Sequence, residues 1–454
     1  MRGNRDILIR GGLIVTGKGI EPADLAISGE KITGVGTELD VNPEEVIDAT
    51  GSFILPGFID AHTHPDYLDG LENLSRAAAL GGVTTLIHHS FARPGESLVD
   101  TVGEMKRDGE RESLLDFNLH GALSDPESQA EEIPEVEALG ISSFKFLMAY
   151  SKDNVMTDDY QLMRSFDLVG NVGGLAMVHA ENGPAIDYLE DKFLDSNLQG
   201  VEFTQKTRPG SLEAEAINRA VSLAKQAECP LYVVHISTSE GLKVVGKARK
   251  ENSPVFTETC PQYLTLTRGA LDTMGSRAKI APPLRGKEDN QALWDGLRNG
   301  TIDVIASDHA AHSKEVDDFF WEAPYGMPVV QEMPSVVFTE SFRRGKLSLV
   351  RMVQTTSENP ARIFGLYPKK GTLQAGSDAD LVVFDPGQER TITHKRGASH
   401  APYSAFEGYS CLGVPELVMQ RGKVIAKDGQ VSAEPGRGKF VSAKKGASNT
   451  EFPN

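Results

Sequence analysis

The chain has 454 residues, of which 39% are hydrophobic and 45 are glycine, so it is long enough for an α/β barrel with an additional domain. Its 64 acidic residues outnumber 46 basic ones, and the net charge of −18 disfavours nucleic acid or an anionic membrane as a partner. No apolar run approaches the roughly 18 residues of a membrane span, and no secretory signal follows Met1. Three well-separated cysteines suit a reducing cytoplasm, which is the location we expect.

Short strand-like segments with glycine turns occur at both ends of the chain. They cover residues 6–15, 23–27, 31–36, 379–384 and 416–425. Two β-rich ends around a different middle predict one small β-sandwich domain, built from residues 1–56 together with 371–440. Residues 441–454 are rich in Lys, Gly, Ser and Asn, so we expect a flexible tail there.

The middle of the chain, residues 57–370, alternates between strand-like and helical stretches. The predicted strands are apolar runs typical of buried parallel sheets, at 58–64, 84–90, 116–123, 143–149, 175–182, 231–237, 255–261 and 304–310. One helix begins near Ser211, and two others end at Gly82 and Gly300. Eight strands with crossovers predict a closed (β/α)₈ barrel of the TIM type, with long connections at 183–230 and 262–303 over the site.

Polar side chains lie in, or end, five of the predicted strands. They are His62, His64, Lys145, His179, His235 and Asp308. The histidines at 62 and 64 are two apart, so both point to one face of their strand, which in a barrel is the interior. Active sites of such barrels lie at the carboxyl ends of the strands. We expect these residues to bind metal there, because neutral imidazoles suit Zn²⁺ and related divalent ions.

Lys145 is the exception in this set, because a protonated lysine has three donors and no acceptor and cannot ligate a cation. Burial beside metal ions lowers its pKa and favours the neutral amine. A neutral amine can capture carbon dioxide and become an N6-carboxylysine, whose two oxygens can bridge two cations. The sequence therefore predicts two divalent ions joined by a modified Lys145. A salt bridge between Lys145 and Asp308 is the alternative.

Longer motifs surround these residues. They are Gly57–His64, Ser143–Lys145 with Met148–Tyr150, His179–Asn182, Glu258–Leu264, Pro282–Arg285, Ser307–His309 and Asn359–Ala361. Together they resemble the amidohydrolase superfamily, and specifically its dihydropyrimidinase and D-hydantoinase group of cyclic amidases, over nearly the whole chain.

The resemblance implies a binuclear metal-dependent hydrolase that opens a dihydropyrimidine or a 5-substituted hydantoin to an N-carbamoyl amino acid. It also implies the ligands of the two ions: His62, His64 and Asp308 for the first, His179 and His235 for the second, and carboxylated Lys145 for both. A bridging hydroxide would be the nucleophile, and Asp308 would carry its proton to the leaving nitrogen. Tyr150 would donate to the oxyanion, unless it only fills the barrel mouth.

Two positions depart from the family pattern at residues that contact substrate. The family usually has Ser where this chain has Ala281, which keeps the main-chain groups that bind the cyclic amide. The usual Asn of Pro-Asn-Gly is here Tyr325, which is bulkier and lacks the paired donor and acceptor of an amide. This admits a different ring, and the residues around His309 resemble allantoinase-like relatives. Dihydroorotate is disfavoured, because Pro65 and Asp66 replace the arginine that clamps its carboxylate.

The remaining histidines carry weaker signals. For His88, His89 and His120 we expect packing or hydrogen bonding rather than metal ligation. His309 and His312 would orient Asp308 or touch the substrate.

Two further function classes stay open from the sequence. A ring deaminase would keep one metal ion and lack the bridging lysine, and a non-catalytic scaffold would have lost ligands. The resembled enzymes are dimers or tetramers, so we expect a homo-oligomer that acts on a small cyclic amide.

Overall fold

The computed structural model describes residues 6–444. Its centre is an eight-stranded parallel sheet whose strands follow one another in chain order. They are β8 (Phe58–Thr63), β9 (Val83–Ala92), β10 (Asp116–Leu123), β11 (Ser143–Leu147), β12 (Leu175–His179), β13 (Leu231–Val233), β14 (Val255–Thr259) and β15 (Val304–Ile305). A parallel bridge between Thr63 and His309 joins the two edges, so the sheet closes. The predicted barrel fold is confirmed.

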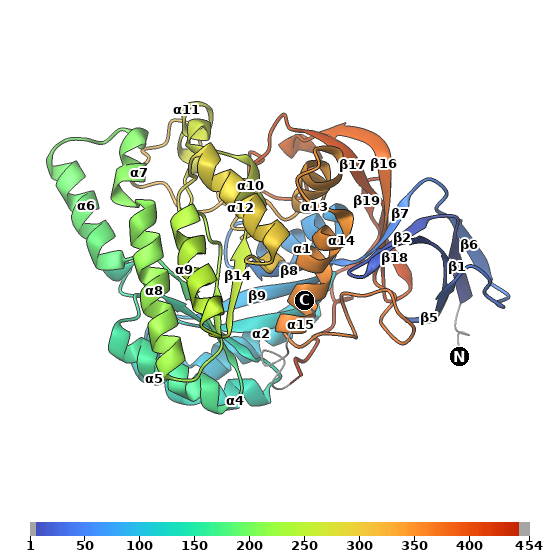
Figure 1. Cartoon of the computed structure of the whole chain (residues 1–454), viewed down its shortest axis with the longest axis horizontal. Coiled ribbons are helices and arrows are strands. Elements are labelled where there is room, and N and C mark those ends of the chain that lie inside the picture. Colours follow the sequence, from blue (N-terminus) through green and yellow to red (C-terminus); the bar gives the residue numbers. More distant parts are fainter. Residues whose placement is uncertain (1–5, 445–454) are drawn as a thin grey trace.

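Helices follow the strands and cover the barrel (Figure 1). The principal ones are α1 (Gly70–Gly81), α2 (Leu98–Glu112), α4 (Ile133–Ala138), α5 (Asp159–Asn171), α8 (Gly210–Gln226), α9 (Ser239–Lys250), α12 (Lys287–Asn299), α13 (Met333–Phe338), α14 (Leu349–Val353) and α15 (Asn359–Ile363). The long connections add α6 (Gly183–Asp195), α7 (Thr204–Thr207), α10 (Pro261–Thr265) and α11 (Leu271–Met274), and α3 (Pro126–Gln129) follows β10. None of the helices within residues 6–444 has the length and apolar character to cross a membrane.

Two predicted helix ends fall where glycine permits a left-handed residue. Helix α1 is followed by Gly82 at φ 101°, and α12 by Gly300 at φ 82°. A residue with a Cβ adopts this conformation only at a cost, which makes glycine the usual residue after a helix. The stop signals of the sequence therefore had a local physical cause.

Several barrel strands are shorter than the sequence predicts. The run at 231–237 was predicted as one strand, but β13 ends at Val233, and β15 ends at Ile305 rather than Ala310. Beyond these points the chain turns, with His235 at φ 37° and Asp308 at φ 51°. Apolar residues continue past each strand because the loops are also buried, so the sequence pattern does not reveal where pairing stops.

The two ends of the chain form two further sheets. One has the order β5-β4-β1-β6 and the other the order β19-β18-β17-β16-β7-β2-β3, which mixes both termini (Figure 1). The strands are β1 (Asp6–Arg10), β2 (Leu13–Thr16), β3 (Gly19–Pro22), β4 (Asp24–Ser28), β5 (Lys31–Gly36), β6 (Glu45–Asp48), β7 (Phe53–Pro56), β16 (Leu381–Thr391), β17 (Ser410–Gln420), β18 (Lys423–Lys427) and β19 (Gln430–Val431).

The faces of these two sheets share a buried apolar core that includes Ile9, Leu25, Ile54, Leu381 and Met419. Residues far apart in sequence thus fill one core, and the predicted sandwich of both chain ends is confirmed as a fold class. The exact domain boundaries at 56/57 and 370/371 stay predictions.

The predicted flexible tail is held in place where it begins. The backbone N–H of Val441 donates to the carbonyl of Phe117 on β10 at 2.8 Å, and that of Lys444 donates to Gly365 at 3.0 Å. Val441 is 2% exposed, because it is apolar and packs beneath the barrel. The rest of the predicted tail, residues 445–454, lies outside the described residues.

Candidate active site

All nine residues that the sequence predicts at the site border one cavity of about 380 Å³ at the carboxyl ends of the barrel strands. They are His62, His64, Lys145, Tyr150, His179, His235, Ala281, Asp308 and Tyr325. They come from six different strand ends or loops, so only the closed barrel brings them together. Their individual roles stay predictions.

Asp308 lies between the first two histidines. Its Oδ1 is 3.2 Å from Nε2 of His62 and 3.1 Å from Nε2 of His64. The other ring nitrogen of His62 is 2.7 Å from Oε1 of Glu258, which fixes the ring and leaves Nε2 directed at Asp308. Three donor atoms of the kind that hold a divalent ion therefore converge at one point.

His179 and His235 form a second group across the cavity. Nδ1 of His179 is 3.0 Å from Nε2 of His235, and Nε2 of His179 is 2.8 Å from Oε2 of Glu181. Two imidazole nitrogens at this separation cannot both be protonated without repulsion. Burial and the neighbouring ring lower the pKa of His235 well below its usual value, so it is held as the neutral imidazole that ligates metal.

Lys145, on β11, lines the same cavity and is 2% exposed, and its charge would act on histidines of both groups. It makes no ion pair with any carboxylate among residues 6–444, so the alternative salt bridge with Asp308 is absent there. Burial lowers the pKa of its amine to about 8, although the charges of Asp308 and Glu258 oppose the shift. A substantial fraction of such an amine is neutral near pH 7–8 and can react with carbon dioxide.

Buried carboxylates support the histidines from behind, and the sequence reasoning missed them. Glu258 contacts His62, the N–H of His235 at 3.2 Å and the hydroxyl of Tyr232 at 2.9 Å, and burial raises its pKa to about 8. Glu181 contacts His179 and pairs with Arg208 at 2.7 Å. Burial alone would raise the pKa of Glu181, but Arg208 and His179 lower it to about 2.

Signals for both carboxylates were present in the sequence. Glu181 is two residues after His179, at the spacing that places two side chains on one face of an extended chain. Glu258 is an acid inside a predicted buried strand, and a buried charge needs a partner. Such partners fix the orientation of ligand imidazoles and raise their basicity.

Two tyrosines form one wall of the cavity. The ring of Tyr150 lies 5.1 Å from that of His179 and 6.2 Å from that of Tyr325. Tyr325 is held between two cations, with the guanidinium of Arg208 4.9 Å and the ammonium of Lys279 4.4 Å from its ring centre. These cation–π contacts fix the ring of the residue that departs from the family pattern.

Three of the site residues have a left-handed backbone conformation. Tyr150, His235 and Asp308 have φ values of 68°, 37° and 51°. A residue with a side chain adopts this left-handed region at a cost of about 1–3 kcal/mol, and such residues concentrate at functional sites. The strain turns three side chains out of strand geometry and into the same cavity.

The secondary histidines divide into different environments. Nδ1 of His88 is 2.8 Å from Oγ1 of Thr63, and His120 contacts the carbonyl of Ala61 at 2.9 Å, so both act in packing and hydrogen bonding as predicted. His309 lies behind the cavity with Nε2 2.9 Å from Asp69, whereas His312 lines the cavity.

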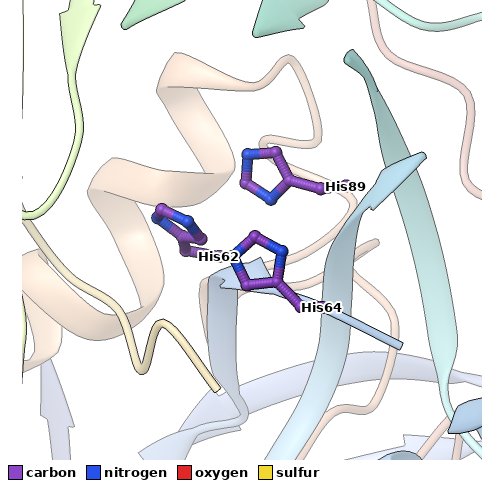
Figure 2. A group of neighbouring side chains, drawn as sticks. All are labelled: His62, His64 and His89. Carbon is purple, nitrogen blue, oxygen red and sulfur yellow. The ribbon is translucent and has the colours of Figure 1, made fainter. Parts of the chain in front are cut away.

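His89 packs against neighbouring rings as predicted, but it also lies beside the first two histidines of the site. Donor atoms of His62, His64 and His89 all lie within 4.8 Å of one another. Figure 2 shows the three rings grouped around a common space. In the sequence, only the alternation of faces along the strand distinguishes His89 from His88.

Comparison with known proteins agrees with this geometry. The family described as "Amidohydrolase family" matches residues 53–425. The chain belongs to the amidohydrolase family. A D-hydantoinase of Ralstonia pickettii is 38% identical over 456 residues, covering 97% of this chain and 99% of the relative.

Solved structures give the same result for the fold. A dihydropyrimidinase from Brevibacillus agri superposes with a TM-score of 0.92 at 34% identity, covering 97% of this chain and 99% of the other. An L-hydantoinase from Arthrobacter aurescens, also titled dihydropyrimidinase, has a TM-score of 0.91 at 34% identity, with 96% and 100% covered. The likeness therefore spans both domains.

The donor set fits divalent metal ions. Nδ1 of His64 and Nδ1 of His235 are buried and have no hydrogen-bond partner among the described residues. Neighbouring imidazoles and a carboxylate oxygen face one another at about hydrogen-bond distance. Lys145 borders the same cavity and has no ion pair within residues 6–444. A site with only a structural role does not require this group of imidazoles and carboxylates. Zn²⁺ and related ions are coordinated by these side chains.

Proposed function

We propose that the chain is a metal-dependent hydrolase that opens a dihydropyrimidine or a 5-substituted hydantoin to an N-carbamoyl amino acid. The observation that carries this proposal is one cavity bordered by four histidines, one aspartate and Lys145, which has no carboxylate partner in the described part of the chain. The names of the similar proteins supply the substrate class.

The proposed ligands fall into two groups. His62, His64 and Asp308 would hold one ion, His179 and His235 the other, and Lys145 would hold both as its N6-carboxylate. We propose Zn²⁺, because imidazole nitrogens with carboxylate oxygens suit it. Bound divalent ions would supply a nucleophile at neutral pH and polarise the scissile carbonyl.

The protein's own groups would move the proton and hold the substrate. Asp308 faces both His62 and His64, so its carboxylate can accept the proton that the nucleophile loses and deliver it to the departing ring nitrogen. Hydroxyl then ends on the carbonyl carbon and hydrogen on the nitrogen, which balances the hydrolysis.

Substrate contacts would come from the opposite wall. Tyr150 would donate to the developing oxyanion, and burial favours its protonated, donating form by raising its pKa well above the usual value. The main chain at Ala281 would bind the cyclic amide. Tyr325, which is fixed by Arg208 and Lys279, would place its aromatic face against the substrate ring.

An allantoinase-like activity is disfavoured, because the similar proteins described above are named for hydantoin or dihydropyrimidine. A deaminase is disfavoured because Lys145 lies at the centre of the donor set.

A substrate panel tests the proposal. Enzyme stripped with a chelator would be reconstituted with Zn²⁺ and bicarbonate and offered dihydrouracil, hydantoins with 5-substituents, allantoin and adenine. We expect ring opening of dihydrouracil or a hydantoin, measured as N-carbamoyl product, only in the reconstituted enzyme. Turnover confined to allantoin or adenine, or equal turnover without metal, would contradict it.

We also propose a homo-oligomer, a dimer or tetramer, in the cytoplasm. Cys229, Cys260 and Cys411 are buried and unpaired, which suits a reducing compartment. Sedimentation equilibrium of the reconstituted enzyme would give the assembly, and a monomer at micromolar concentration would exclude it.

A further inference from the structure

His89 is a buried histidine that lies beside the proposed first metal ligands but is not one of the six. It is on β9, next in the barrel to β8, and is 0% exposed. Its ring centre lies 4.4 Å from that of His62 and 4.9 Å from that of His64. One nitrogen donor of each of the three residues falls within 4.8 Å of the others.

Neither ring nitrogen of His89 makes a hydrogen bond of normal geometry within residues 6–444. The backbone of Thr63 is near enough only to oppose the strong lowering of the His89 pKa by burial. A buried imidazole without a partner loses the free energy of its hydrogen bonds with water, so such groups are uncommon in folded proteins. The neighbouring His88 is equally buried, but its Nδ1 contacts Thr63 at 2.8 Å. His88 thus has one bonded ring nitrogen and one buried nitrogen without a partner, whereas neither nitrogen of His89 has a normal hydrogen bond among the described residues.

The ring of His89 is held in place by its neighbours. It stacks against Phe91, with ring centres 5.8 Å apart and planes inclined by 20°, and lies parallel to His64 within 15°. The ring of His120 is 4.7 Å away from that of His89, and His120 is itself fixed by Ala61 and Ser143. The imidazoles of His62, His64 and His89 thus form a preorganised group (Figure 2).

We propose that His89 is a third imidazole ligand of the metal ion held by His62 and His64. This rests on the proposed function only in taking that ion to be present. A first-row divalent cation such as Zn²⁺ is the ligand class, because imidazole nitrogens bind it directly.

With His89 as a ligand, the two metal sites would have different numbers of protein donors. Without Lys145, the first site keeps His62, His64, Asp308 and His89, whereas the second keeps only His179 and His235. Four donors complete a tetrahedral zinc site and two do not. A variant that cannot form the carboxylysine should therefore keep the first ion and lose the second.

Three variants of the full chain test this: Lys145→Met, Lys145→Met with His89→Leu, and Lys145→Met with His88→Leu. The last is a matched control, because it removes an equally buried imidazole from the adjacent position of β9. Zinc content would be measured by mass spectrometry after equilibration in graded zinc buffers, with thermal unfolding as the check on folding.

We expect Lys145→Met to keep about one tightly bound ion, as four protein donors allow. Adding His89→Leu should weaken that ion by more than about 100-fold, since loss of even an outer partner of a ligand costs about 10–100-fold. Adding His88→Leu should leave the affinity unchanged. Equal zinc affinity in the two double variants would overturn the proposal.

A second measurement needs no variant. In zinc-loaded crystals of the unaltered protein, anomalous scattering should place an ion about 2.0–2.1 Å from a nitrogen of His89, the distance of a Zn–N bond. An ion on His62 and His64 that lies away from His89 would overturn the inference and leave the proposed function intact. Absence of zinc from both sites would instead contradict the proposed function.

Discussion

Two lysines of this chain are equally buried and have opposite surroundings. Lys145 is at the cavity and has no carboxylate partner among residues 6–444, whereas Nζ of Lys370 contacts Asp116, Asp380 and Asp378 at 2.6, 2.7 and 2.9 Å. Burial lowers the pKa of Lys145 to about 8. Burial also opposes the charge of Lys370, but the three aspartates outweigh it and raise its pKa well above the usual value.

The difference lies in partners and not in depth. Lys370 is a permanent cation that ties Asp116, at the start of β10, to Asp378 and Asp380 of the sandwich. It therefore fills the second group of acidic side chains that could otherwise hold a metal ion. Lys145 is available for chemistry because no carboxylate among the described residues forms an ion pair with it. The same residue type serves stability at one end of the barrel and the proposed reaction at the other.

Replacing Lys370 by Met should give the largest effect in this comparison. It leaves Asp380 without an ion-pair partner among the described residues, whereas Asp116 keeps Arg421 and Asp378 keeps Lys31. Breaking a buried ion pair in this way costs about 3–5 kcal/mol. Urea unfolding would measure the loss, and metal content should not change in the folded fraction. The matched control is Lys31→Met, because Lys31 is exposed and also contacts Asp378, at 2.7 Å. Lys31 is itself exposed to water, which screens its charge, so its contribution should be nearer the roughly 0–1 kcal/mol of exposed ion pairs.

Replacing Lys145 by Met should have the reverse outcome. Metal content and turnover should fall together, turnover by more than about 100-fold, because loss of an outer partner alone costs about 10–100-fold. The free energy of unfolding of the metal-free protein should not decrease, since a buried, unpaired amine is replaced by an apolar chain. Full turnover with both ions retained would refute the bridging role.

A third buried lysine, Lys314, has neutral partners, and its replacement should have a smaller effect. Lys314 donates to the carbonyls of Lys279, Pro324 and Gly326 at 2.9, 3.2 and 2.6 Å, and so joins two walls of the cavity. Replacement by Met removes three hydrogen bonds worth about 0.5–1.5 kcal/mol each. It should raise KM more than it lowers kcat, because Lys314 touches the substrate walls and none of the proposed ligands.

The pH dependence of stability provides a separate test of Lys314. Burial, with help from Lys279, lowers the pKa of Lys314 to about 7, whereas an unfolded lysine titrates near about 10.4. Between these values the unfolded chain binds one proton more than the folded chain, so wild-type stability should rise with pH relative to Lys314→Met. Parallel stability curves of the two proteins between pH 7 and 10 would contradict this.

Much of this arrangement could be read from the sequence. The spacing of His62 and His64 and the position of Lys145 in a buried run predicted a common cavity, because strand periodicity and barrel closure are general. The contacts of Glu258 and His89 could not be predicted, because they depend on how side chains of different barrel strands are oriented toward one another. The turned backbone at His235 and Asp308 was equally hidden, because buried loops have the same apolar composition as buried strands.

The pairing of β7 with β16 places Phe53 opposite Phe384. During synthesis, more than three hundred residues must therefore leave the ribosome before the hydrogen-bonding edge of β7 finds its partner. Until then that edge is open to foreign strands, which is a known route to aggregation. Slow translation or truncation before residue 381 should consequently increase the demand for chaperones, even though every barrel strand has already been made.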